Sequence, residues 1–407
     1  MKALSLEEAV GLLLEQTALP AKKEWVPILE AAGRICGEDV YASFDQPPFN
    51  RSPLDGFAVF HEDLAGAGRE CPAALQIAGT VYAGDSPQIS LKRGQAVRIM
   101  TGAPIPDGAD CVVRQEDTDD SDTEKEGGQV SVFVSLKRHQ NYCFMGEDMK
   151  KGELLVHRGE LLTPALAGLL ASEGHGQVKV YGKPGVAILS TGSELTEPGE
   201  RLEPGRIYDS NRILLTAYAA KQGVHIASSH SVPDDPEIIA QAVRKALETS
   251  DLVVSTGGVS VGRHDYMEEA GKRAGAEVLF HGVKVKPGGP LLVMKKSGKH
   301  MICLSGNPFA AFVTFVLLVL PVIRRLQGSR QSVVPERTWG IMTDDFLKAS
   351  PGRRFVRALI QDGKIGFPSM GHSSGMVSSL HLCNCLIDIP AGNQGLRKGE
   401  RVEVVLF

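Results

Sequence analysis

Three short segments rich in glycine, serine and asparagine have the residue types that bind an anion through backbone amides. They are 190–194 (Ser-Thr-Gly-Ser-Glu), 256–262 (Thr-Gly-Gly-Val-Ser-Val-Gly) and 304–308 (Leu-Ser-Gly-Asn-Pro). Glycine lets the backbone approach a phosphate or a ring edge, and amides at helix N-termini favour negative charge. A single segment of this kind is more often a plain turn, but three at one sheet edge favour a binding crevice. The candidate ligand-binding residues in them are Thr191, Gly192, Ser193, Gly257, Gly258, Ser260, Ser305, Gly306, Asn307 and Pro308.

Acidic residues near these segments, or in earlier glycine-containing segments, are candidate ligands for a divalent cation. They are Glu194, Asp234, Asp265, Asp55 and Asp148. Mg²⁺ takes oxygen ligands and keeps several waters, so carboxylates around a phosphate suit it. The alternative is that most of them are helix caps or turn residues. Asp234-Asp235-Pro236 has the pattern of an N-cap followed by proline, and spacing alone favours this structural alternative.

Two lysines and two arginines supply the positive charge that an oxyanion needs. Lys284 and Lys286 alternate along a strand-like segment, so both are expected on one strand face, while Arg353 and Arg354 lie in the C-terminal part. Charge-assisted donors of this kind bind phosphate-like anions, although a solvated strand face explains the two lysines equally well. The chain has no Walker loop and no Ser/His/Asp or Cys/His arrangement, and none of its 11 histidines has metal-ligand spacing.

Alternating strand and helix patterns over 181–328 must position the three glycine segments. Residues 185–189 and 252–255 have buried-strand patterns, and helices are expected over 211–222 and 236–249. Alternation of this kind predicts an α/β domain with a mostly parallel sheet and helices on both faces. Ligands bind such sheets outside the carboxyl ends of the strands, which is where the three segments lie.

The remaining sequence predicts three further domains. We expect a discontinuous, helical N-terminal domain (1–46 plus 147–180), a β-rich insert domain (47–146) and a C-terminal β domain (329–407). Residues 1–16 have the apolar spacing of an amphipathic helix, with Ser5 and Glu8 as a capping box. A second helix, opening at Thr163-Pro164, is expected to pack back on the first and so make the first domain discontinuous.

Composition and charge argue against several classes of protein. The net charge of −4 gives no general attraction for nucleic acid or for an anionic membrane. The longest apolar run, 309–320, falls short of the roughly 20 residues needed to span a bilayer and predicts a buried helix. The seven cysteines match no zinc pattern and indicate free thiols in a reducing cytosol, so we expect a cytoplasmic protein.

An ordered set of motifs extends over essentially the whole chain. Besides the three glycine segments and Asp265-Tyr266, it includes 54–58 (Leu-Asp-Gly-Phe-Ala) and 98–104 (Arg-Ile-Met-Thr-Gly-Ala-Pro). The set resembles the molybdopterin molybdenumtransferases, the MoeA family, to which the C-terminal half of gephyrin also belongs. The resemblance implies an elongated homodimer with a discontinuous first domain, a β-rich second, an α/β third that binds molybdopterin and a β-barrel fourth.

The resemblance also implies a reaction and a role for most of the candidate residues. Adenylylated molybdopterin and molybdate would react with Mg²⁺ present, releasing AMP and molybdenum cofactor, and a transient contact with the molybdopterin adenylyltransferase is expected. The implied catalytic residues are Asp55, Thr101, Glu194 and Asp265. Asp55 and Thr101, together with Asp148, are expected to face the partner subunit's crevice. The implied metal ligands are Glu194, Asp234, Asp265 and Asp148, and the implied groups for molybdate or phosphate are Lys286, Arg353 and Ser374.

Several positions depart from the family's usual motifs, among them residues of the segment 50–57 (Asn-Arg-Ser-Pro-Leu-Asp-Gly-Phe). Gly289 replaces the second lysine of Lys-Pro-Gly-Lys-Pro, while Ser305 and Ala310 replace a proline and a serine around Asn307. The loss of a lysine and a serine near the implied oxyanion site leaves open a molybdopterin-binding protein without catalysis. A scaffold like gephyrin is expected to need further domains or a long linker, for which these 407 residues leave no room.

Overall fold

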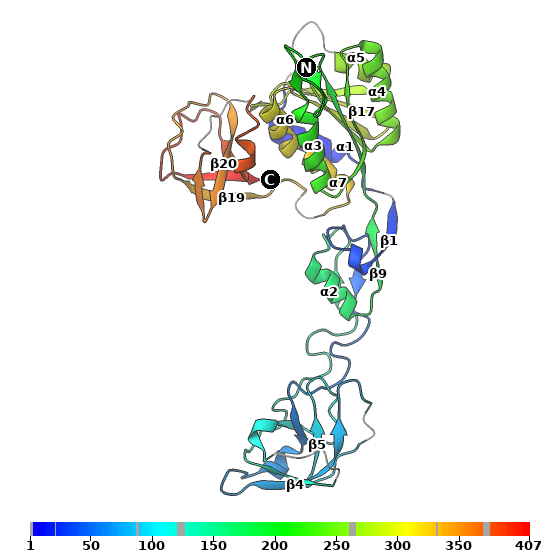
Figure 1. The fold of residues 1–407 in the computed structure, drawn as a ribbon, viewed down its shortest axis with the longest axis vertical. Coiled ribbons are helices and arrows are strands. Elements are labelled where there is room, and N and C mark those ends of the chain that lie inside the picture. Colours follow the sequence, from blue (N-terminus) through cyan, green and yellow to red (C-terminus); the bar gives the residue numbers. More distant parts are fainter. Residues whose placement is uncertain are drawn as a thin grey trace. The chain divides into compact units, whose positions relative to one another are not determined.

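The computed structural model describes residues 3–20, 22–86, 89–119, 127–259, 266–330, 333–368 and 375–407. Ser260, Asp265 and Ser374, three of the predicted site residues, lie outside these ranges. The chain forms two compact units (Figure 1). The first consists of Met1–Glu38, His157–Ala167 and Gly176–Phe407, and the second of Asp39–Val156 and Gly168–His175.

A six-stranded sheet forms the centre of the first unit. Its order is β13-β10-β14-β18-β17-β15; the first four strands are parallel, and β17 is antiparallel to both of its neighbours. The bounds are β10 (Gly185–Thr191), β13 (His225–Val232), β14 (Leu252–Thr256), β15 (Glu277–His281), β17 (Leu292–Lys296) and β18 (Lys299–Leu304). The predicted mostly parallel sheet is therefore confirmed.

Helices cover both faces of this sheet because alternate residues of its strands point to opposite sides. Val186 and Ile188 of β10 belong to one hydrophobic cluster, with residues of α1, α3 and the helix that begins at Pro308. Ala187 and Leu189 belong to another, with residues of α4 and α5. The bounds are α1 (Leu6–Gln16), α3 (Ser210–Lys221), α4 (Pro236–Thr249) and α5 (Tyr266–Arg273).

Helix α1 begins with the predicted capping box. The Ser5 amide donates to Glu8 Oε2 at 2.7 Å, and the Glu8 amide donates to Ser5 Oγ at 3.2 Å. Leu6, Ala9 and Leu13 are buried in the α/β cluster, against the helix that begins at Pro308. The helix therefore packs there, rather than on the helix opening at Thr163 as expected, because the α/β domain offers its apolar stripe a large apolar surface.

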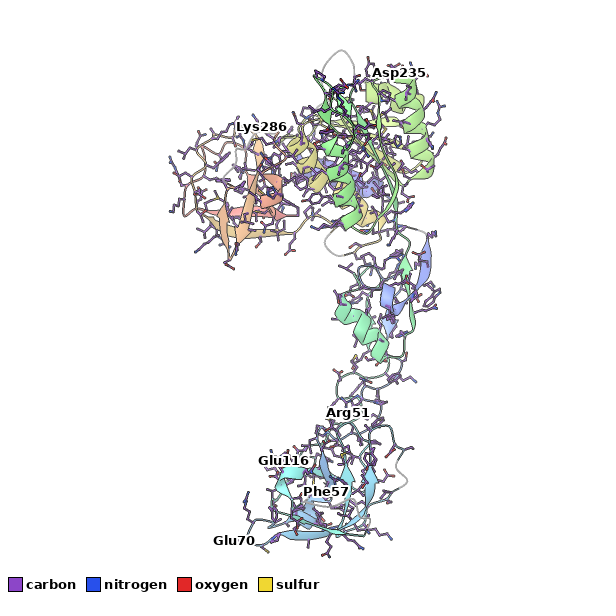
Figure 2. All side chains as sticks on the ribbon, in the orientation of Figure 1. Arg51, Phe57, Glu70, Glu116, Asp235 and Lys286 are labelled. Atoms are coloured by element: carbon purple, nitrogen blue, oxygen red, sulfur yellow. The ribbon has the colours of Figure 1, made fainter. Side chains whose placement is uncertain are left out.

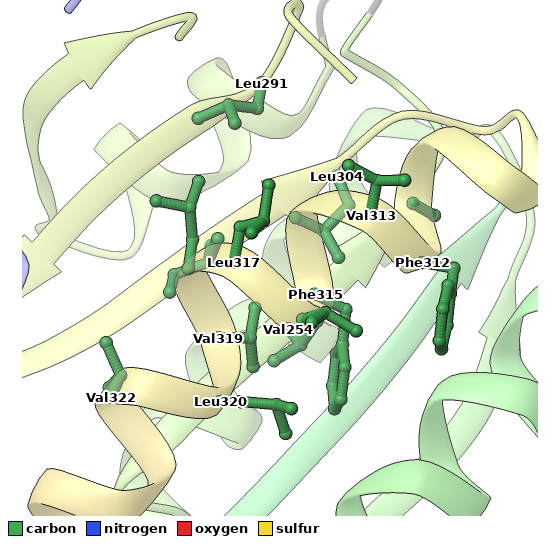
Figure 3. Packing of buried hydrophobic residues seen from close by; sticks show 14 of the residues in the cluster. Val254, Leu291, Leu304, Phe312, Val313, Phe315, Leu317, Val319, Leu320 and Val322 are labelled. Carbon is green, nitrogen blue, oxygen red and sulfur yellow. The ribbon is translucent and has the colours of Figure 1, made fainter. Parts of the chain in front are cut away.

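The longest apolar helix runs from Pro308 to Leu326, through α6 (Pro308–Thr314), a π-helical turn η4 (Phe315–Val319) and α7 (Leu320–Leu326). Its 19 residues contain an 18-residue window with a mean hydropathy of 2.1, so the helix is long and apolar enough to cross a membrane by length and composition alone. The helix is therefore longer than the sequence predicted. In the fold 83% of that apolar window is buried, with Phe312, Phe315 and Val319 in the cluster drawn in Figure 3. Such burial is typical of the core helix of a globular domain.

In the sequence, the main segment of the second unit (Asp39–Val156) lies between two strands of the first unit that pair with each other. β1 (Lys23–Pro27) is antiparallel to β9 (Gln177–Tyr181), which agrees with a discontinuous first domain. A 3-10 turn η1 (Ile28–Glu30) follows β1, and a short parallel pair, β11 (Leu195–Thr196) and β12 (Ile207–Tyr208), follows β10. The residue boundaries proposed for the domains stay a prediction.

The C-terminal part of the first unit is a closed barrel. β20 pairs with both β21 and β22, so the strands β20-β21-β19-β23-β22 form a ring, and β16 adds to β20 from outside it. The bounds are β16 (Val285–Lys286), β19 (Arg337–Met342), β20 (Arg353–Gln361), β21 (Lys364–Gly366), η5 (Leu380–Leu382), β22 (Cys385–Ile389) and β23 (Arg401–Leu406). The predicted β-barrel is confirmed.

The second unit contains a five-stranded sheet in the order β6-β3-β5-β4-β7, as predicted for a β-rich insert. The bounds are β2 (Val40–Tyr41), β3 (Gly56–Val59), η2 (His61–Leu64), β4 (Ala73–Val81), β5 (Gln95–Ile99), β6 (Cys111–Arg114), η3 (Gln115–Asp117), β7 (Gln129–Val132) and β8 (Leu154–Val156). β2 pairs with β8 where the chain enters and leaves the unit. Helix α2 (Pro164–Ser172) contributes residues to both units.

Candidate functional site

The three glycine segments meet at the carboxyl ends of β10, β14 and β18, which are neighbours in the sheet. Together with the start of α3 they line a cavity of about 1040 Å³. The predicted residues on its wall are Thr191, Gly192, Ser193, Glu194, Asp234, Gly257, Gly258, Ser305, Gly306, Asn307 and Pro308. The fold thus brings these side chains and amides together, while the roles assigned to them stay predictions.

Glycine is required where the segments touch. Gly257 has φ +93°, and a Cβ on it would lie 2.3 Å from the carbonyl oxygen of Thr191. Gly258 has φ +67°, and its Cβ would lie 2.9 Å from Cγ of Met267. Neither the backbone conformation nor the space admits a side chain there. A Cβ on Gly306 would lie 3.7 Å from Cα of Gly257, so the second and third segments also lie in near contact.

Buried polar atoms at the cavity indicate a ligand or water site. Among the described residues, Thr191 Oγ1 and Asn211 Oδ1 are buried without a hydrogen-bond partner, and both residues line the cavity. Buried polar groups without partners are rare in folded proteins, and they concentrate where a ligand or an ordered water completes the bonding. The donors and acceptors of this wall therefore suit a polar ligand better than an apolar one.

The first turn of α3 is part of the site, and sequence reasoning missed it. Asn211 Nδ2 donates to Thr256 Oγ1 at 3.1 Å and to Gly306 O at 2.7 Å. Asp209, which is 1% exposed, caps the helix and accepts from Ser190 Oγ and from Arg212 Nε. The available signal was Asp209-Ser210-Asn211 at the start of a helix, a capping pattern that gives no indication of a binding role.

Two of the predicted metal ligands, Glu194 and Asp234, lie on the cavity wall. The Asp234 carboxylate accepts from the Ser193 amide at 2.9 Å and from Ser193 Oγ at 3.2 Å. The neighbouring Asp235 (Figure 2) is the N-cap of α4 and accepts from Glu237 N and Ile238 N. The capping pattern in the sequence is therefore explained by Asp235, which leaves the Asp234 side chain at the cavity.

The carboxylates present fit Mg²⁺ that binds together with a substrate. Across the described ranges, no three His, Cys, Asp or Glu side chains lie close enough to hold a metal ion by themselves. Mg²⁺ is commonly held by one or two carboxylates, with substrate phosphates and water supplying the rest. Glu194 and Asp234 are suitable donors for that arrangement. Asp265, the third predicted ligand of this part of the chain, lies outside the described residues.

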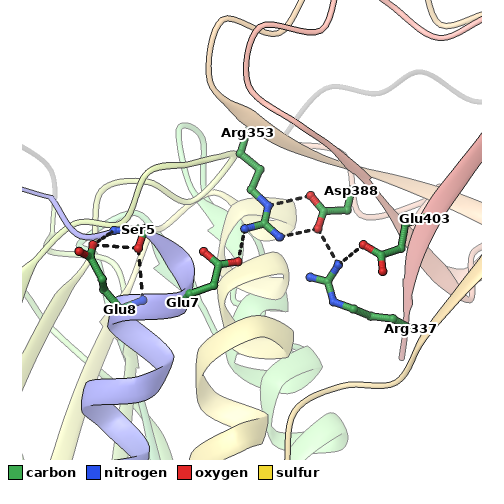
Figure 4. Close-up of polar contacts among 7 residues, drawn as sticks. All are labelled: Ser5, Glu7, Glu8, Arg337, Arg353, Asp388 and Glu403. Carbon is green, nitrogen blue, oxygen red and sulfur yellow. Dashed lines mark hydrogen bonds and ion pairs between the residues drawn. The ribbon is translucent and has the colours of Figure 1, made fainter.

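Lys286 and Arg353 are not among the residues that line the cavity. Lys286 is exposed on β16 (Figure 2). The guanidinium of Arg353 is held by carboxylates (Figure 4): two of its nitrogens donate to Asp388 at 2.8 and 2.7 Å, and a third donates to Glu7 at 2.5 Å. The hydrogen bonds to Asp388, the largest cause, raise the pKa of Arg353. An oxyanion would have to displace these carboxylates to bind Arg353, which is a physical argument against the sequence-based assignment.

A different arginine, Arg357, joins the barrel to the cavity wall. It is fully buried, lies 4.4 Å from the centroid of the Phe309 ring and donates to Met376 O at 2.8 Å. Phe309 directly follows Pro308, and Met376 lies between Gly375 and Val377, so these contacts adjoin the cavity at two points. Burial lowers the pKa of Arg357 from the ordinary arginine value. The sequence around Arg357, which lies within β20, does not indicate that its side chain lies next to the cavity wall.

Asp55, Thr101 and Asp148 belong to the second unit. The Asp55 carboxylate accepts from the Thr101 amide at 2.6 Å and from Thr101 Oγ1 at 2.7 Å. The hydrogen bond from the Thr101 amide lowers the pKa of Asp55 most, and the hydrogen bond from the Thr101 hydroxyl lowers it further. The carboxylate is therefore ionised at neutral pH. Asp148 is exposed, and its amide donates to Gln46 O at 3.0 Å.

Three family models match successive parts of the chain. Residues 4–174 match the "MoeA N-terminal region (domain I and II)", 187–325 the "Probable molybdopterin binding domain" and 340–407 the "MoeA C-terminal region (domain IV)". Among similar proteins, a "Molybdopterin molybdenumtransferase" of Staphylococcus epidermidis is 36% identical, covering 99% of this chain and 95% of that protein. One of Staphylococcus aureus is 35% identical, with the same coverage of 99% and 95%.

The fold is similar to that of solved members of the same family. The crystal structure of a molybdopterin biosynthesis MoeA protein from Pyrococcus horikoshii OT3 matches with a TM-score of 0.85 and 32% identity, covering 100% of both chains. A second crystal structure of a MoeA protein from that genus and species matches with a TM-score of 0.83. The chain therefore belongs to the MoeA family of molybdenum cofactor biosynthesis.

Proposed function

We propose that this protein is a molybdopterin molybdenumtransferase that uses the cavity at the three glycine segments to bind adenylylated molybdopterin and to insert molybdate into it, releasing AMP. The observation that carries the proposal is the convergence of these segments on one wall, with Glu194 and Asp234 beside them. The names of the relatives, molybdopterin molybdenumtransferases of two Staphylococcus species, support the reaction.

The cavity offers different chemistry to different parts of such a substrate. Glycine-rich backbone near Gly257 and Gly258 allows close approach, and the N-terminus of the 308–326 helix favours the phosphate charge. The unpartnered Thr191 Oγ1 and Asn211 Oδ1 add polar capacity beneath that surface. The cavity of about 1040 Å³ is large enough for a ligand of nucleotide size.

The proposed reaction needs a cation beside the phosphoanhydride, and Glu194 with Asp234 would hold Mg²⁺ there. Bound Mg²⁺ would neutralise charge on the phosphate oxygens as the anhydride is cleaved. Ser193 orients Asp234 through its amide and hydroxyl, so this carboxylate is held in place before a ligand arrives. Asp265, which directly precedes α5, is proposed as a further ligand and catalytic residue.

The oxyanion-binding and intersubunit parts of the proposal rest on the resemblance. We propose that Lys286, Arg353 and Ser374 hold molybdate or phosphate. The hydrogen bonds of Arg353 to Asp388 and Glu7 argue against oxyanion binding by this one residue. A homodimer in which Asp55, Thr101 and Asp148 complete the partner's site is proposed as well. We also propose a cytoplasmic location and a transient contact with the molybdopterin adenylyltransferase.

Reconstitution with purified components tests the reaction. The protein is mixed with adenylylated molybdopterin, Mg²⁺ and molybdate, and released AMP is measured together with active molybdenum cofactor. The proposal predicts that both products appear in equal amounts and depend on Mg²⁺. Tight binding of the pterin nucleotide without release of AMP would instead identify a molybdopterin-binding protein without catalysis.

A further inference from the structure

The first turn of α3 is bonded to the ends of all three strands that carry the glycine segments. Asp209 accepts from Ser190 Oγ near the end of β10. Two residues later, Asn211 donates to Thr256 Oγ1 at the end of β14 and to Gly306 O after β18. Thr256 Oγ1 in turn donates to Ser305 O at 3.0 Å. Asn211 and Thr256 are thus the two side chains that hold the carbonyls of residues 305 and 306.

These bonds fix the orientation of two successive peptide groups. In a trans peptide the C=O and the following N–H point in opposite directions. With the carbonyls of Ser305 and Gly306 held by Thr256 and Asn211, the N–H groups of Gly306 and Asn307 point away from those side chains. The Asn307 N–H donates to Ser305 Oγ at 3.3 Å, within the same segment. Gly306 and Asn307 line the cavity together with Asn211 and Thr256. The two carbonyls are therefore bonded to protein donors there, whereas an unbonded carbonyl would repel an anionic ligand.

Asparagine has the chemistry that this position needs. Its amide group supplies two donor hydrogens from one nitrogen, and Nδ2 has two acceptors, one hydroxyl and one carbonyl. Aspartate has the same shape but no donor at neutral pH, and its charge would face the Gly306 carbonyl. Glutamine would place the same group one carbon farther along the chain. Gly306 has no side chain to hold its peptide plane, so its orientation depends on such external bonds.

We propose that Asn211, together with Thr256, is a positioning residue that locks the 305–307 peptides with their carbonyls bonded to protein donors, so that these carbonyls do not repel an anionic ligand. The lock sets the affinity of the cavity for the phosphate-bearing substrate, so this inference rests on the proposed function for its ligand. Asn211 acts through the backbone of residues 305–307, and no role in bond cleavage is assigned to it.

Two pairs of variants separate the lock from a general loss of stability. Asn211→Ala removes both donors, and Asn211→Asp replaces them with a charge that repels the Gly306 carbonyl. Thr256→Val removes the hydroxyl at nearly constant shape, whereas Thr256→Ser keeps it. Asn384→Ala is the matched control, because Asn384 also bonds backbone through its amide, to Ile360 N and O at 2.9 Å, but in the barrel and away from the cavity.

The first measurement needs no ligand. Hydrogen–deuterium exchange of the full-length protein should be faster over 304–308 in Asn211→Ala, Asn211→Asp and Thr256→Val, and unchanged there in Thr256→Ser and Asn384→Ala. Wild-type exchange over 304–308 in the first three variants would overturn the proposed lock. This result does not depend on what the cavity binds, so it separates failure of the lock from failure of the proposed function.

The second measurement is the dissociation constant for adenylylated molybdopterin, with AMP as a second probe. Loss of the bonds that orient a charged contact should weaken substrate binding about 10-fold in Asn211→Ala and Thr256→Val, and the double variant should be no worse than additive. Thr256→Ser and Asn384→Ala should bind like the wild type. Unchanged affinity in Asn211→Ala, or equal loss in Asn384→Ala, would overturn the role of the lock in binding. A wild-type protein that binds neither probe would contradict the proposed function, and the exchange result alone would then decide whether the lock exists.

Discussion

Arg353 and Asp388 form a two-bond ion pair between neighbouring barrel strands, and Glu7 of α1 binds the same guanidinium (Figure 4). Arg337 donates to Asp388 as well, at 2.8 Å. Burial by itself raises the pKa of Asp388, but the bonds from Arg353 and Arg337 outweigh it and hold the pKa below its usual value. The bond from Arg353 likewise lowers the pKa of Glu7. The arrangement indicates that Arg353 fastens the barrel to the α/β domain.

Arg353→Ala should therefore destabilise the protein at neutral pH, by about 1–3 kcal/mol after allowance for the partial exposure of the pair. Both carboxylates have a lowered pKa in the folded state, so their stabilisation is present above the unfolded pKa and is lost as the pH falls through the folded pKa. The difference from the wild type should thus shrink below about pH 4. Urea unfolding of the wild type and of Arg353→Ala at pH 7 and pH 3 measures this difference in the free energy of unfolding.

A surface arginine provides the control for this variant. Arg397 lies 3.7 Å from Asp345 with 73% of its side chain exposed, so Arg397→Ala should leave the free energy of unfolding nearly unchanged. If Arg353→Ala instead kept wild-type stability and raised the molybdate requirement about 10-fold, Arg353 would be an oxyanion ligand, as the sequence implied.

Gly257→Ala should impair both folding and substrate binding. Its φ of +93° strains any side chain, and its Cβ would overlap the carbonyl of Thr191 at 2.3 Å. We expect a loss of about 2–4 kcal/mol of stability, the sum of a strained backbone and an overpacked contact. Gly363→Ala has a similar φ of +72° but no atom near its Cβ, so it should show the backbone strain alone. An equal loss of the free energy of unfolding in Gly257→Ala and Gly363→Ala would contradict the close approach of Gly257 to Thr191.

Asp234→Asn and Asp235→Asn should separate a metal ligand from a helix cap. Asp234→Asn is expected to raise the Mg²⁺ concentration needed for AMP release at least about 10-fold, because one charged ligand becomes neutral. Asp235→Asn keeps an acceptor at the N-cap of α4, so a change below about 1 kcal/mol in stability is expected, with the wild-type Mg²⁺ response. The same Mg²⁺ response in both variants would remove Asp234 from the cation site.

Thr101→Val should raise the pKa of Asp55. The hydrogen bond from the Thr101 hydroxyl contributes to the lowered pKa and is lost in this variant. The hydrogen bond from the Thr101 backbone amide, which lowers the pKa more, remains. A carbon-detected NMR titration of the Asp55 carboxyl measures the change. Thr118→Val removes a hydroxyl that donates to the Gln115 carbonyl in the same unit, so the Asp55 titration should not move in that variant. An unchanged titration in Thr101→Val would mean that the bond is absent in solution.

The intersubunit role of Asp55 has its own test, complementation between inactive variants. If Asp55 serves the partner's cavity, a mixed dimer of Asp55→Asn and Glu194→Gln subunits contains one site with both native carboxylates. Mixing and reassociating the two variants should therefore restore part of the AMP release that each lacks alone. No restoration, or a fully active species that sediments as a 43.6 kDa monomer, would contradict the proposed homodimer.

The sequence predicted the elements of the α/β domain and the convergence of the glycine segments well, because both follow from local patterns. Strand runs such as 252–254 are apolar throughout, and parallel strands bring their carboxyl ends to one edge. The capping box of Ser5 and Glu8 is likewise a local signal. The closed barrel came from the family resemblance, since short alternating strands do not reveal which strands pair.

Contacts made by the tertiary fold were beyond sequence reasoning. Nothing local distinguishes Arg353, held by Asp388 and Glu7, from Arg357, buried against Phe309. Gly289 is a further case: a Cβ on it would lie 2.9 Å from the Val285 carbonyl oxygen, so the family's lysine cannot be restored here without a backbone shift. The sequence indicates only that Asn211 begins a helix, because the acceptors of its side chain lie 45 and 95 residues away.

A crystal structure of the full-length protein with adenylylated molybdopterin tests the central claim most directly. The account predicts ligand density against Gly257, Gly258 and Asn307, with the phosphates on the side of Glu194 and Asp234. Density elsewhere on the protein, for instance beside Arg353, with the cavity holding only solvent, would contradict it.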